Sequence, residues 1–490
     1  MRSKRETLWM AIAIVALCLL VSVGVLYGIT AFQTRAAEVK LPDPTAVPTA
    51  APTAGPTARP TEAPTPEPTE APTEAPTEEP TEAPQGVRSG LLREGYTPDR
   101  VVVLSRHSVR SPFNGSGSIL GKITPHEWLP LSSSNGELTL RGGVLETKMG
   151  QYFRKWLEAE GLFPENFRPT DERVRFYANS VQRTIATSKY FAAGLLPAAN
   201  TKIETHVKYG RMDPVFTPKL TFYSDAYGAA AKAQILELFS DDVAGLAESY
   251  ALLSDVIDME QSQARTSGEL AALDANDFTL ILKRNAEPGL SGSLKTAYSV
   301  SDALILQYYE ADDLSEAAFG RTLSFAQWKA IARIKDVYGD VLFTAPLVAV
   351  NAANPLLREI RSELSAQDRI FTFLCGHDSN LSAVLGALGA ADYALPGALE
   401  KVPIGGKLVF VRWHAPDGSR YVSLDFVYRT ADEIRSAAPL DLANPPAVLT
   451  VPLQDLTANG DGLYPEQDFM DRLKQAITAY DRLAVDYPVR

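Results

Sequence analysis

The sequence contains few of the residues that cross-link chains or bind metal ions: two cysteines and five histidines among 490 residues. Cys18 lies in an apolar segment near the N-terminus and Cys375 lies far downstream, so we predict no disulfide between them. The histidines do not pair at the spacing of metal ligands, and two cysteines cannot form a cysteine-rich zinc site. They are His107, His126, His206, His377 and His414. We therefore expect no metal and no other cofactor, although a site built from carboxylates alone stays open.

The sequence also lacks any basic tract. Its formal net charge is −12, and residues 41–85 hold eight acidic residues and one arginine, a net of −7. Most of the imbalance therefore lies in this one segment, and the remainder is only mildly acidic. We expect no nucleic-acid partner, whereas a local positive pocket remains compatible with these totals.

Charged residues are absent from residue 7 to residue 34, shortly after the basic residues Arg2, Lys4 and Arg5. This run exceeds the ~20 apolar residues that cross a bilayer and the ~7–15 of a cleavable signal peptide. We interpret residues 1–40 as a short cytoplasmic tip followed by an uncleaved signal anchor. The basic N-terminus then stays in the cytoplasm, and the rest of the chain lies outside the cell. Cleavage and secretion is the alternative.

Large apolar side chains are almost absent from residues 41–86, where proline recurs every third or fourth position among threonine, alanine and glutamate. Such a segment cannot bury enough surface to offset the entropy of ordering. The prolines favour an extended, semi-rigid polyproline II conformation. The segment is predicted to be a stalk.

Residues 87–490 show alternating strand and helix patterns. Short apolar runs typical of buried strands occupy 101–105, 174–178, 369–376, 407–413 and 420–428. Helical spacing covers 139–161, and a second helix opens at 179–180 and runs to about 194. Residues 222–320 are largely helical, which predicts a smaller inserted cap. The alternation indicates an α/β domain with its sheet covered on both faces.

Polar residues that suit phosphate follow three of the predicted strands, at the ends where α/β proteins bind ligands. They are Arg106, His107 and Arg110 after the first strand, Arg183 after the second, and His377 and Asp378 after the third. Guanidinium groups bind phosphate through paired hydrogen bonds, and helix N-termini add N–H donors. A single acid among cations is better suited to proton transfer than to phosphate binding.

Each of these residues taken alone also has an ordinary structural explanation. Arg106 and Arg110 could pair with surface acids, and Arg183 could be a solvated helix residue. His377 could be a satisfied core histidine, and Asp378 could belong to a helix cap. Their joint placement at strand ends favours a shared site.

The segment RHSVRSP (106–112) resembles the Arg-His-Gly-X-Arg-X-Pro signature of the histidine acid phosphatase family, and GHDSN (376–380) resembles its later His-Asp motif. The likeness extends over roughly residues 90–480, in the order and spacing of the bacterial glucose-1-phosphatase branch, a relative of the phytases. It implies the histidine phosphatase fold, with a central mixed sheet flanked by helices and a helical cap.

The resemblance also implies roles. His107 would be the nucleophile that forms a phosphohistidine without a metal, and Asp378, protonated when substrate binds, would donate a proton to the leaving oxygen. The phosphate would be bound by Arg106, Arg110, Arg183 and His377. An acidic pH optimum is expected.

Two further positions bear on the substrate. Ser108 stands where the family usually has glycine, and a side chain there would narrow the pocket. Glu310 matches a position where the glucose-1-phosphatase branch has a carboxylate that contacts the sugar, although it could equally be a solvated helix-end residue. Both favour a small phosphorylated substrate such as glucose-1-phosphate. The alternatives are an inositol phosphate, as in phytases, or a catalytically silent surface protein that binds ligands.

Overall fold

The computed structural model describes residues 87–489. The predicted anchor (1–40) and stalk (41–86) lie outside these residues. Within residues 87–489, no helix is both long and apolar enough to span a bilayer.

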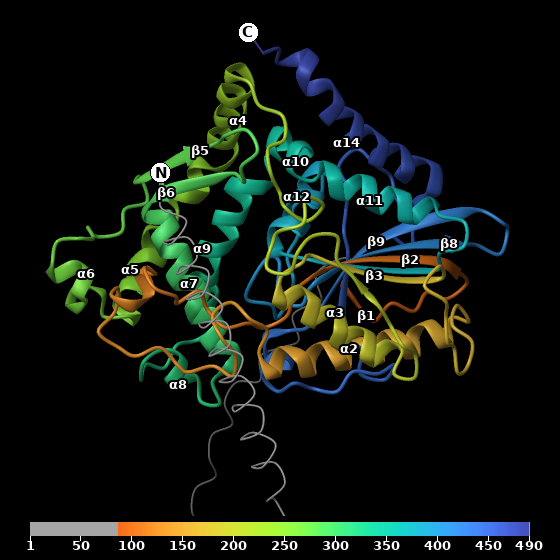
Figure 1. Ribbon diagram of the computed structural model, residues 1–490, viewed down its shortest axis with the longest axis horizontal. Helices are drawn as coiled ribbons and strands as arrows, with labels where there is room; N and C mark the ends of the chain where they lie inside the picture. Colours follow the sequence, from red (N-terminus) through yellow and green to blue (C-terminus); the bar gives the residue numbers. More distant parts are fainter. Residues whose placement is uncertain (1–86, 490) are drawn as a thin grey trace, which may run out of the picture. The chain divides into compact units, whose positions relative to one another are not determined.

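A mixed sheet forms the centre of the described chain (Figure 1). Its nine strands among residues 87–489 run in the order β1-β10-β9-β8-β2-β7-β3-β4, with β11 pairing β9. They are β1 (Val87–Ser89), β2 (Thr97–Arg106), β3 (Val174–Ala178), β4 (Ile203–Glu204), β7 (Phe371–Gly376), β8 (Lys407–His414), β9 (Arg420–Tyr428), β10 (Ala447–Thr450) and β11 (Tyr464–Pro465). Central β2 is parallel to β7 and antiparallel to β8, so the fold is α/β with a mixed sheet, as predicted.

Helices cover both faces of this sheet. In Figure 1, α2 and α3 lie along one face, and α11 and α14 lie along the other. The longer helices are α2 (Leu140–Ala159), α3 (Gln182–Leu195), α4 (Asp225–Ala244), α5 (Ala247–Val256), α7 (Ser293–Glu310), α9 (Phe325–Phe343), α11 (Asn354–Ser365), α12 (Asp378–Leu388) and α14 (Glu466–Asp486).

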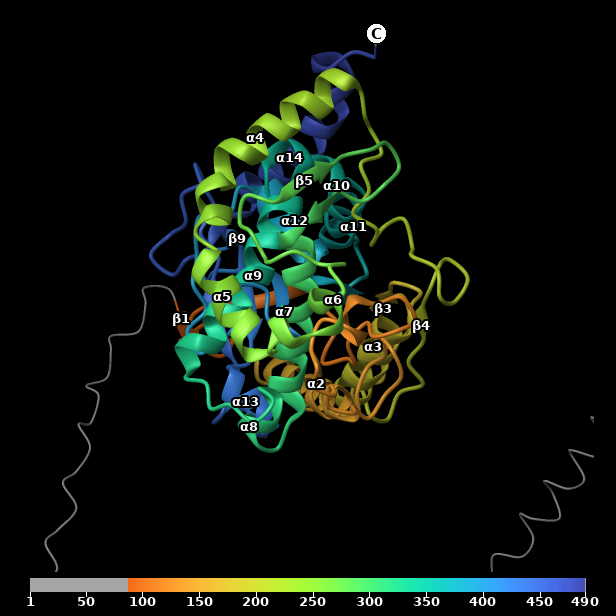
Figure 2. The same ribbon diagram turned by 90° about the vertical axis from the view of Figure 1, so that its left-hand side faces the viewer.

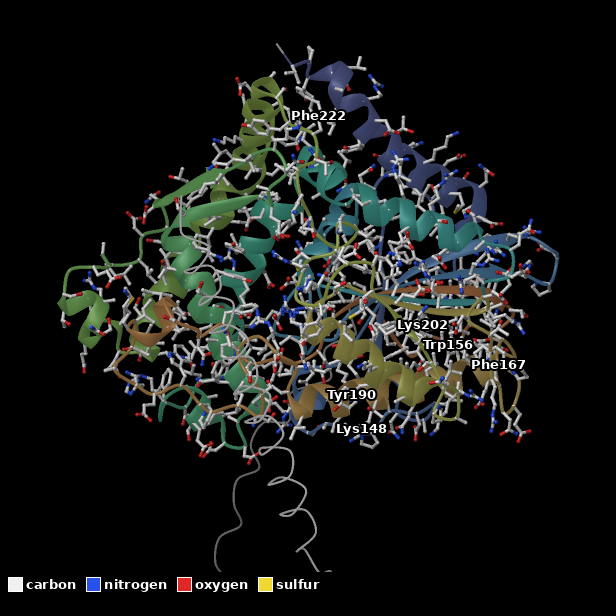
Figure 3. The ribbon with its side chains drawn as sticks, viewed as in Figure 1. Lys148, Trp156, Phe167, Tyr190, Lys202 and Phe222 are labelled. Carbon is white, nitrogen blue, oxygen red and sulfur yellow. The ribbon has the colours of Figure 1, made fainter. Side chains whose placement is uncertain are left out.

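The apolar run of β2 shows why both faces are covered. Successive side chains of a strand point to opposite faces. Val101 and Val103 pack in the cluster that contains Trp156 of α2, which is labelled in Figure 3. Val102 and Leu104 pack on the other face, in the larger hydrophobic cluster. A continuous rather than alternating apolar run is therefore what a two-sided core requires.

Helices α2 and α3 pack unusually closely. Thr139 caps α2 by accepting a hydrogen bond from the Gly142 N–H at 3.1 Å. A Cβ on Gly150 would lie 2.2 Å from the Phe191 carbonyl oxygen, and one on Gly194 would lie 2.1 Å from that of Thr147. Only glycine permits this approach, which fixes α3 against α2.

The predicted cap region, 222–320, contains α4, α5, α7 and two short helices, α6 (Gln263–Thr266) and α8 (Leu314–Ala317). It also contains a hairpin, β5 (Phe278–Ile281) with β6 (Gly289–Gly292), that the sequence did not suggest. Figure 2 shows α5, α7 and α9 running together in front of the sheet. Since α9 packs against α4, α5 and α7, the helical group extends past residue 320 and shares one core with the sheet.

Candidate active site

The site lies where three parallel strands end side by side. Arg106 at the end of β2 is in register with Gly376 of β7, and Ala178 at the end of β3 is in register with Cys375. The carboxyl ends of β2, β7 and β3 therefore meet at one edge of the sheet. His107 and His377 follow β2 and β7 directly, and their ring centroids are 5.4 Å apart.

The main chain on either side of His107 is held by hydrogen bonds. The His107 N–H donates to the Gly376 carbonyl at 3.0 Å, and the Gly405 N–H donates to the His107 carbonyl at 3.2 Å. Nδ1 lies 2.9 Å from the Ser108 carbonyl oxygen, which can only accept, so Nδ1 carries the proton and Nε2 keeps its lone pair. Burial, followed by the charge of Arg183, holds the pKa of His107 well below its usual value. The ring is therefore neutral, and its Nε2 lone pair is available.

In His377, Nδ1 rather than Nε2 lies toward Arg183. Asn179 accepts backbone N–H bonds from Ser180 and Asp213 through Oδ1, so its Nδ2 donates to His377 Nε2 at 2.7 Å. The proton of His377 is then on Nδ1, which lies 3.4 Å from Nη2 of Arg183. Two donors that converge at this distance suit a shared oxygen of an anion.

The three arginines differ in their partners. Arg106 pairs with Glu400 at 2.9 Å and with Asp378 at 3.2 Å, and Arg110 pairs with Asp302 at 2.8 Å. Arg183 forms no ion pair within the described residues, and burial, followed by the charge of Arg110, lowers its pKa to about 10. The Nε atoms of all three are buried without a hydrogen-bond partner within the described residues. The site is therefore positive and rich in donors.

A buried ion-pair network supports these arginines, and sequence reasoning missed it. Lys335 of α9 contacts Asp302 of α7 at 2.9 Å and Glu400 at 2.7 Å, which links Arg110 to Arg106 through alternating charges. These partners come from segments far apart in the chain. The one available signal was Asp302, an acid among the buried residues of α7.

Asp378 begins α12 and its side chain is 38% exposed, so it is accessible to a ligand. Burial alone would raise its pKa, but Arg106, Lys335 and His377 outweigh burial, and the net pKa is lowered. The carboxyl is thus ionised in the free site. The protonated form implied by the resemblance requires a phosphate that takes over the charge of Arg106.

Ser108 and Glu310 both contact charged residues of α2. Ser108 is buried and its hydroxyl interacts with the buried carboxylate of Glu146, which pairs with Lys407 at 3.0 Å. Glu310 ends α7, with its carboxylate 3.6 Å from Arg141. Neither contact is with the arginines and histidines described above, so the roles of Ser108 and Glu310 in substrate choice stay predictions.

Within residues 87–489, His, Cys, Asp and Glu side chains form no group of three or more that could hold a metal ion.

Two histidines and three arginines meet at the carboxyl ends of the central strands. This arrangement is typical of proteins that bind and act on phosphate groups. Residues 99–426 match the model of the histidine phosphatase superfamily, branch 2, and the chain belongs to this superfamily. It is 38% identical over 382 residues to a glucose-1-phosphatase from Salmonella typhimurium, covering 77% of this chain and 92% of the relative. It is 36% identical over 387 residues to a glucose-1-phosphatase from Providencia rettgeri, with the same coverage.

Phytases are also similar. The chain is 29% identical over 375 residues to phytase AppA from Escherichia coli, covering 72% of this chain and 86% of the relative. Among solved structures, the apo phytase from Hafnia alvei superimposes with a TM-score of 0.72 at 26% identity, covering 80% of this chain and 99% of that one. The phytase from Citrobacter braakii gives 0.71 at 27% identity, covering 78% and 98%. The histidine phosphatase fold predicted from the motifs is confirmed.

Proposed function

We propose that this protein is an acid phosphatase that hydrolyses small phosphomonoesters, such as glucose-1-phosphate, through a phosphohistidine intermediate. The observation that carries the proposal is the neutral imidazole of His107 beside the converging donors of Arg183 and His377. A nucleophile without charge can approach a phosphate dianion once cations neutralise that anion.

The proposed reaction has two displacements. Nε2 of His107 attacks phosphorus as the bond to the leaving oxygen breaks, and Asp378 gives that oxygen its proton, which releases the alcohol. Water then attacks the phosphohistidine, Asp378 takes a proton from the water, and the N–P bond breaks to release phosphate. Arg106, Arg110 and Arg183 stabilise the charge on the transferred group in both steps.

Two glucose-1-phosphatases at 36–38% identity, against 29% for phytase AppA, favour the small ester over inositol hexakisphosphate. Glu310, at a position where that branch has a carboxylate, and Ser108, whose side chain would narrow the pocket, support the same choice. The phytase-like alternative is supported by the similarity to solved phytases. In this alternative the two displacements are the same, and only the leaving group differs.

The test uses residues 87–490 and the variants His107→Ala and Asp468→Asn, the latter an exposed acid on α14 and the control. Phosphate release is measured from glucose-1-phosphate and from inositol hexakisphosphate, at acidic and neutral pH, with and without EDTA. Release that resists EDTA, requires His107 and favours glucose-1-phosphate supports the proposal. Preference for the inositol ester supports the phytase alternative, and release from neither supports a silent binding protein.

We also propose that the enzyme is held outside the cell by its N-terminal segment, with the catalytic domain on the stalk. The support is the uncharged run from 7 to 34 and the proline-rich composition of 41–86. Protease added to intact cells should release an active fragment. N-terminal sequencing of the cell-associated protein distinguishes an uncleaved anchor from a cleaved signal peptide, and protection from the protease contradicts the proposal.

A further inference from the structure

A buried ion-pair network of alternating charge runs behind the proposed active site. It joins Arg110 to Asp302 at 2.8 Å, Asp302 to Lys335 at 2.9 Å, Lys335 to Glu400 at 2.7 Å and Glu400 to Arg106 at 2.9 Å. None of these five side chains is more than 7% exposed. Lys335 is at the centre of the network and lies on α9, which runs beside α7 in Figure 2. Replacing buried ion pairs by apolar residues is often neutral or stabilising, so stability alone does not explain this network.

Arg106 connects the network to the proposed proton donor. Its Nη1 contacts Glu400, and its Nη2 lies 3.2 Å from Oδ2 of Asp378. Burial raises the pKa of Asp378, whereas the charges of Arg106 and then of Lys335 lower it. The carboxyl that must hold a proton for the leaving group therefore lies beside two buried cations that favour its ionised form.

Glu400 offsets these two cations. Its Oε1 contacts Arg106 and Lys335, and its Oε2 accepts a hydrogen bond from the Tyr309 hydroxyl at 3.4 Å. Burial raises the pKa of Glu400, but Arg106 and Lys335 outweigh burial, so Glu400 stays ionised. The three cations and two acids of the network leave a net charge of +1. Removing the charge of Lys335 makes the network neutral, and removing that of Glu400 raises it to +2, so the two changes act on Asp378 in opposite directions.

Other ionisable groups also surround Asp378. They are Arg183 of α3, Tyr298 and Asp302 of α7, and His377 before α12. Burial raises the pKa of Tyr298 well above its usual value, and burial followed by the charge of Arg183 holds that of His377 well below its own, so both stay neutral. Lys335 forms its ion pairs with the two acids of the network. Its charge can therefore be removed while Arg110 keeps Asp302 and Arg106 keeps Glu400.

We propose that Lys335 and Glu400 are positioning residues that set the pH range over which Asp378 serves as the proton donor. They act through the charge beside Asp378: Lys335 adds to it, Glu400 subtracts from it, and their balance leaves Asp378 able to hold a proton once the phosphate of the substrate is bound. The inference rests on the proposed function and adds how an acid stays usable beside the cations that bind phosphate.

The variants Lys335→Met and Glu400→Gln test this proposal, because each leaves the remaining charges of the network paired. Single-turnover release of glucose from glucose-1-phosphate, with enzyme in excess, measures the first displacement, which needs protonated Asp378. We expect the pH at which this rate falls to half its maximum to rise by about one unit in Lys335→Met and to fall by about one unit in Glu400→Gln. Lys335→Arg keeps the charge and should follow the wild type, as should Asp468→Asn.

A second substrate separates proton donation from phosphate binding. The leaving group of p-nitrophenyl phosphate needs little proton donation, so the pH profile of its nitrophenol burst should not shift in either variant. Asp336 of α9 also ionises in this range, since burial raises its pKa to about 7. Both variants are therefore repeated together with Asp336→Asn, and the opposite shifts with glucose-1-phosphate should persist.

Shifts in the same direction in both variants, equal shifts with the two substrates, or profiles that match the wild type would overturn the inference. Where one variant does not fold, the direction of the shift in the other decides. A wild type that releases phosphate from no ester fails the proposed function itself. An active wild type whose profile is unchanged by Lys335→Met and Glu400→Gln fails only this inference.

Discussion

At the scale of single residues, the proton donor can be separated from the phosphate ligands by the choice of leaving group. Asp378→Asn cannot protonate an alkoxide, so we expect kcat for glucose-1-phosphate to fall by about 10²–10⁴. p-Nitrophenolate is a good leaving group and needs little proton donation. Its release should slow far less in the first step, and a burst of nitrophenol should precede slow hydrolysis of the phosphohistidine. Stopped-flow absorbance measures both phases, and equal losses on the two substrates would contradict the role of Asp378.

The buried pair behind Ser108 makes a second residue-scale prediction. Lys407 is fully buried, and its Nζ binds Glu146, Ser105 Oγ and the Gly405 carbonyl. Lys407→Met leaves the Glu146 carboxylate buried without its cation, which should cost about 3–5 kcal/mol of unfolding free energy. Glu146→Gln in the same chain should restore much of this loss, because no buried charge remains. Urea denaturation of the single and double variants measures both, and a loss that is simply additive would argue against the pairing.

The convergence of the six candidate residues named from the two motifs and the second strand end could be predicted, because each lies at or shortly after the end of a strand and parallel strands bring their ends together. The ion-pair partners that hold these residues in place could not be predicted. Nothing local marks Asp302 and Glu400 as partners of arginines that are 192 and 294 positions away, or Lys335 as the link between them. The direction of the Ser108 side chain could not be predicted either, because it depends on where α2 places Glu146.

At the scale of secondary-structure elements, the contact of α2 with α3 should be the least tolerant of substitution. A methyl group on Gly194 would meet the Thr147 carbonyl at 2.1 Å, so Gly194→Ala must move α3, which carries Arg183. We expect a loss of about 1–3 kcal/mol in stability and a higher KM. Gly460→Ala is the control, because a Cβ there meets nothing within 4 Å. Denaturant unfolding and steady-state kinetics measure the two effects, and a Gly194→Ala variant as stable as the control would contradict the packing argument.

Elements were predictable where the local pattern was strong. The strands β3 and β9 have the bounds that the sequence indicated, and α2 lies within the predicted helical range 139–161. The hairpin β5–β6 was missed because its strands are four residues long and one begins and ends in glycine. The strands β1, β10 and β11 are short, and only pairing with β9 and with each other makes them strands.

At the scale of the whole molecule, two carboxyl groups of the core, Glu400 and Asp336, make the free energy of unfolding depend on pH. Arg106 and Lys335 outweigh burial and hold the pKa of Glu400 below its usual value. A depressed pKa contributes stability that is present above about 4.5 and is lost as pH falls through the folded value. Burial, with the nearby charge of Glu400, instead raises the pKa of Asp336 to about 7. A raised pKa contributes stability that is present below about 4 and is lost as pH rises toward 7. Together these two groups favour stability at mildly acidic pH.

This dependence can be assigned to one group by substitution. The amide introduced by Asp336→Asn cannot ionise, so that variant should lose less stability than the wild type between pH 5 and 8. The expected difference is about 1–2 kcal/mol, reduced from the full linkage value because Asp336 is only partly buried and is screened by solvent. Thermal unfolding at half-unit steps from pH 4 to 8 measures the two slopes, with Asp468→Asn as the control that should follow the wild type. Parallel curves for Asp336→Asn and the wild type would mean that Asp336 ionises at its ordinary pKa, and the loss of stability above pH 5 would then belong to other groups.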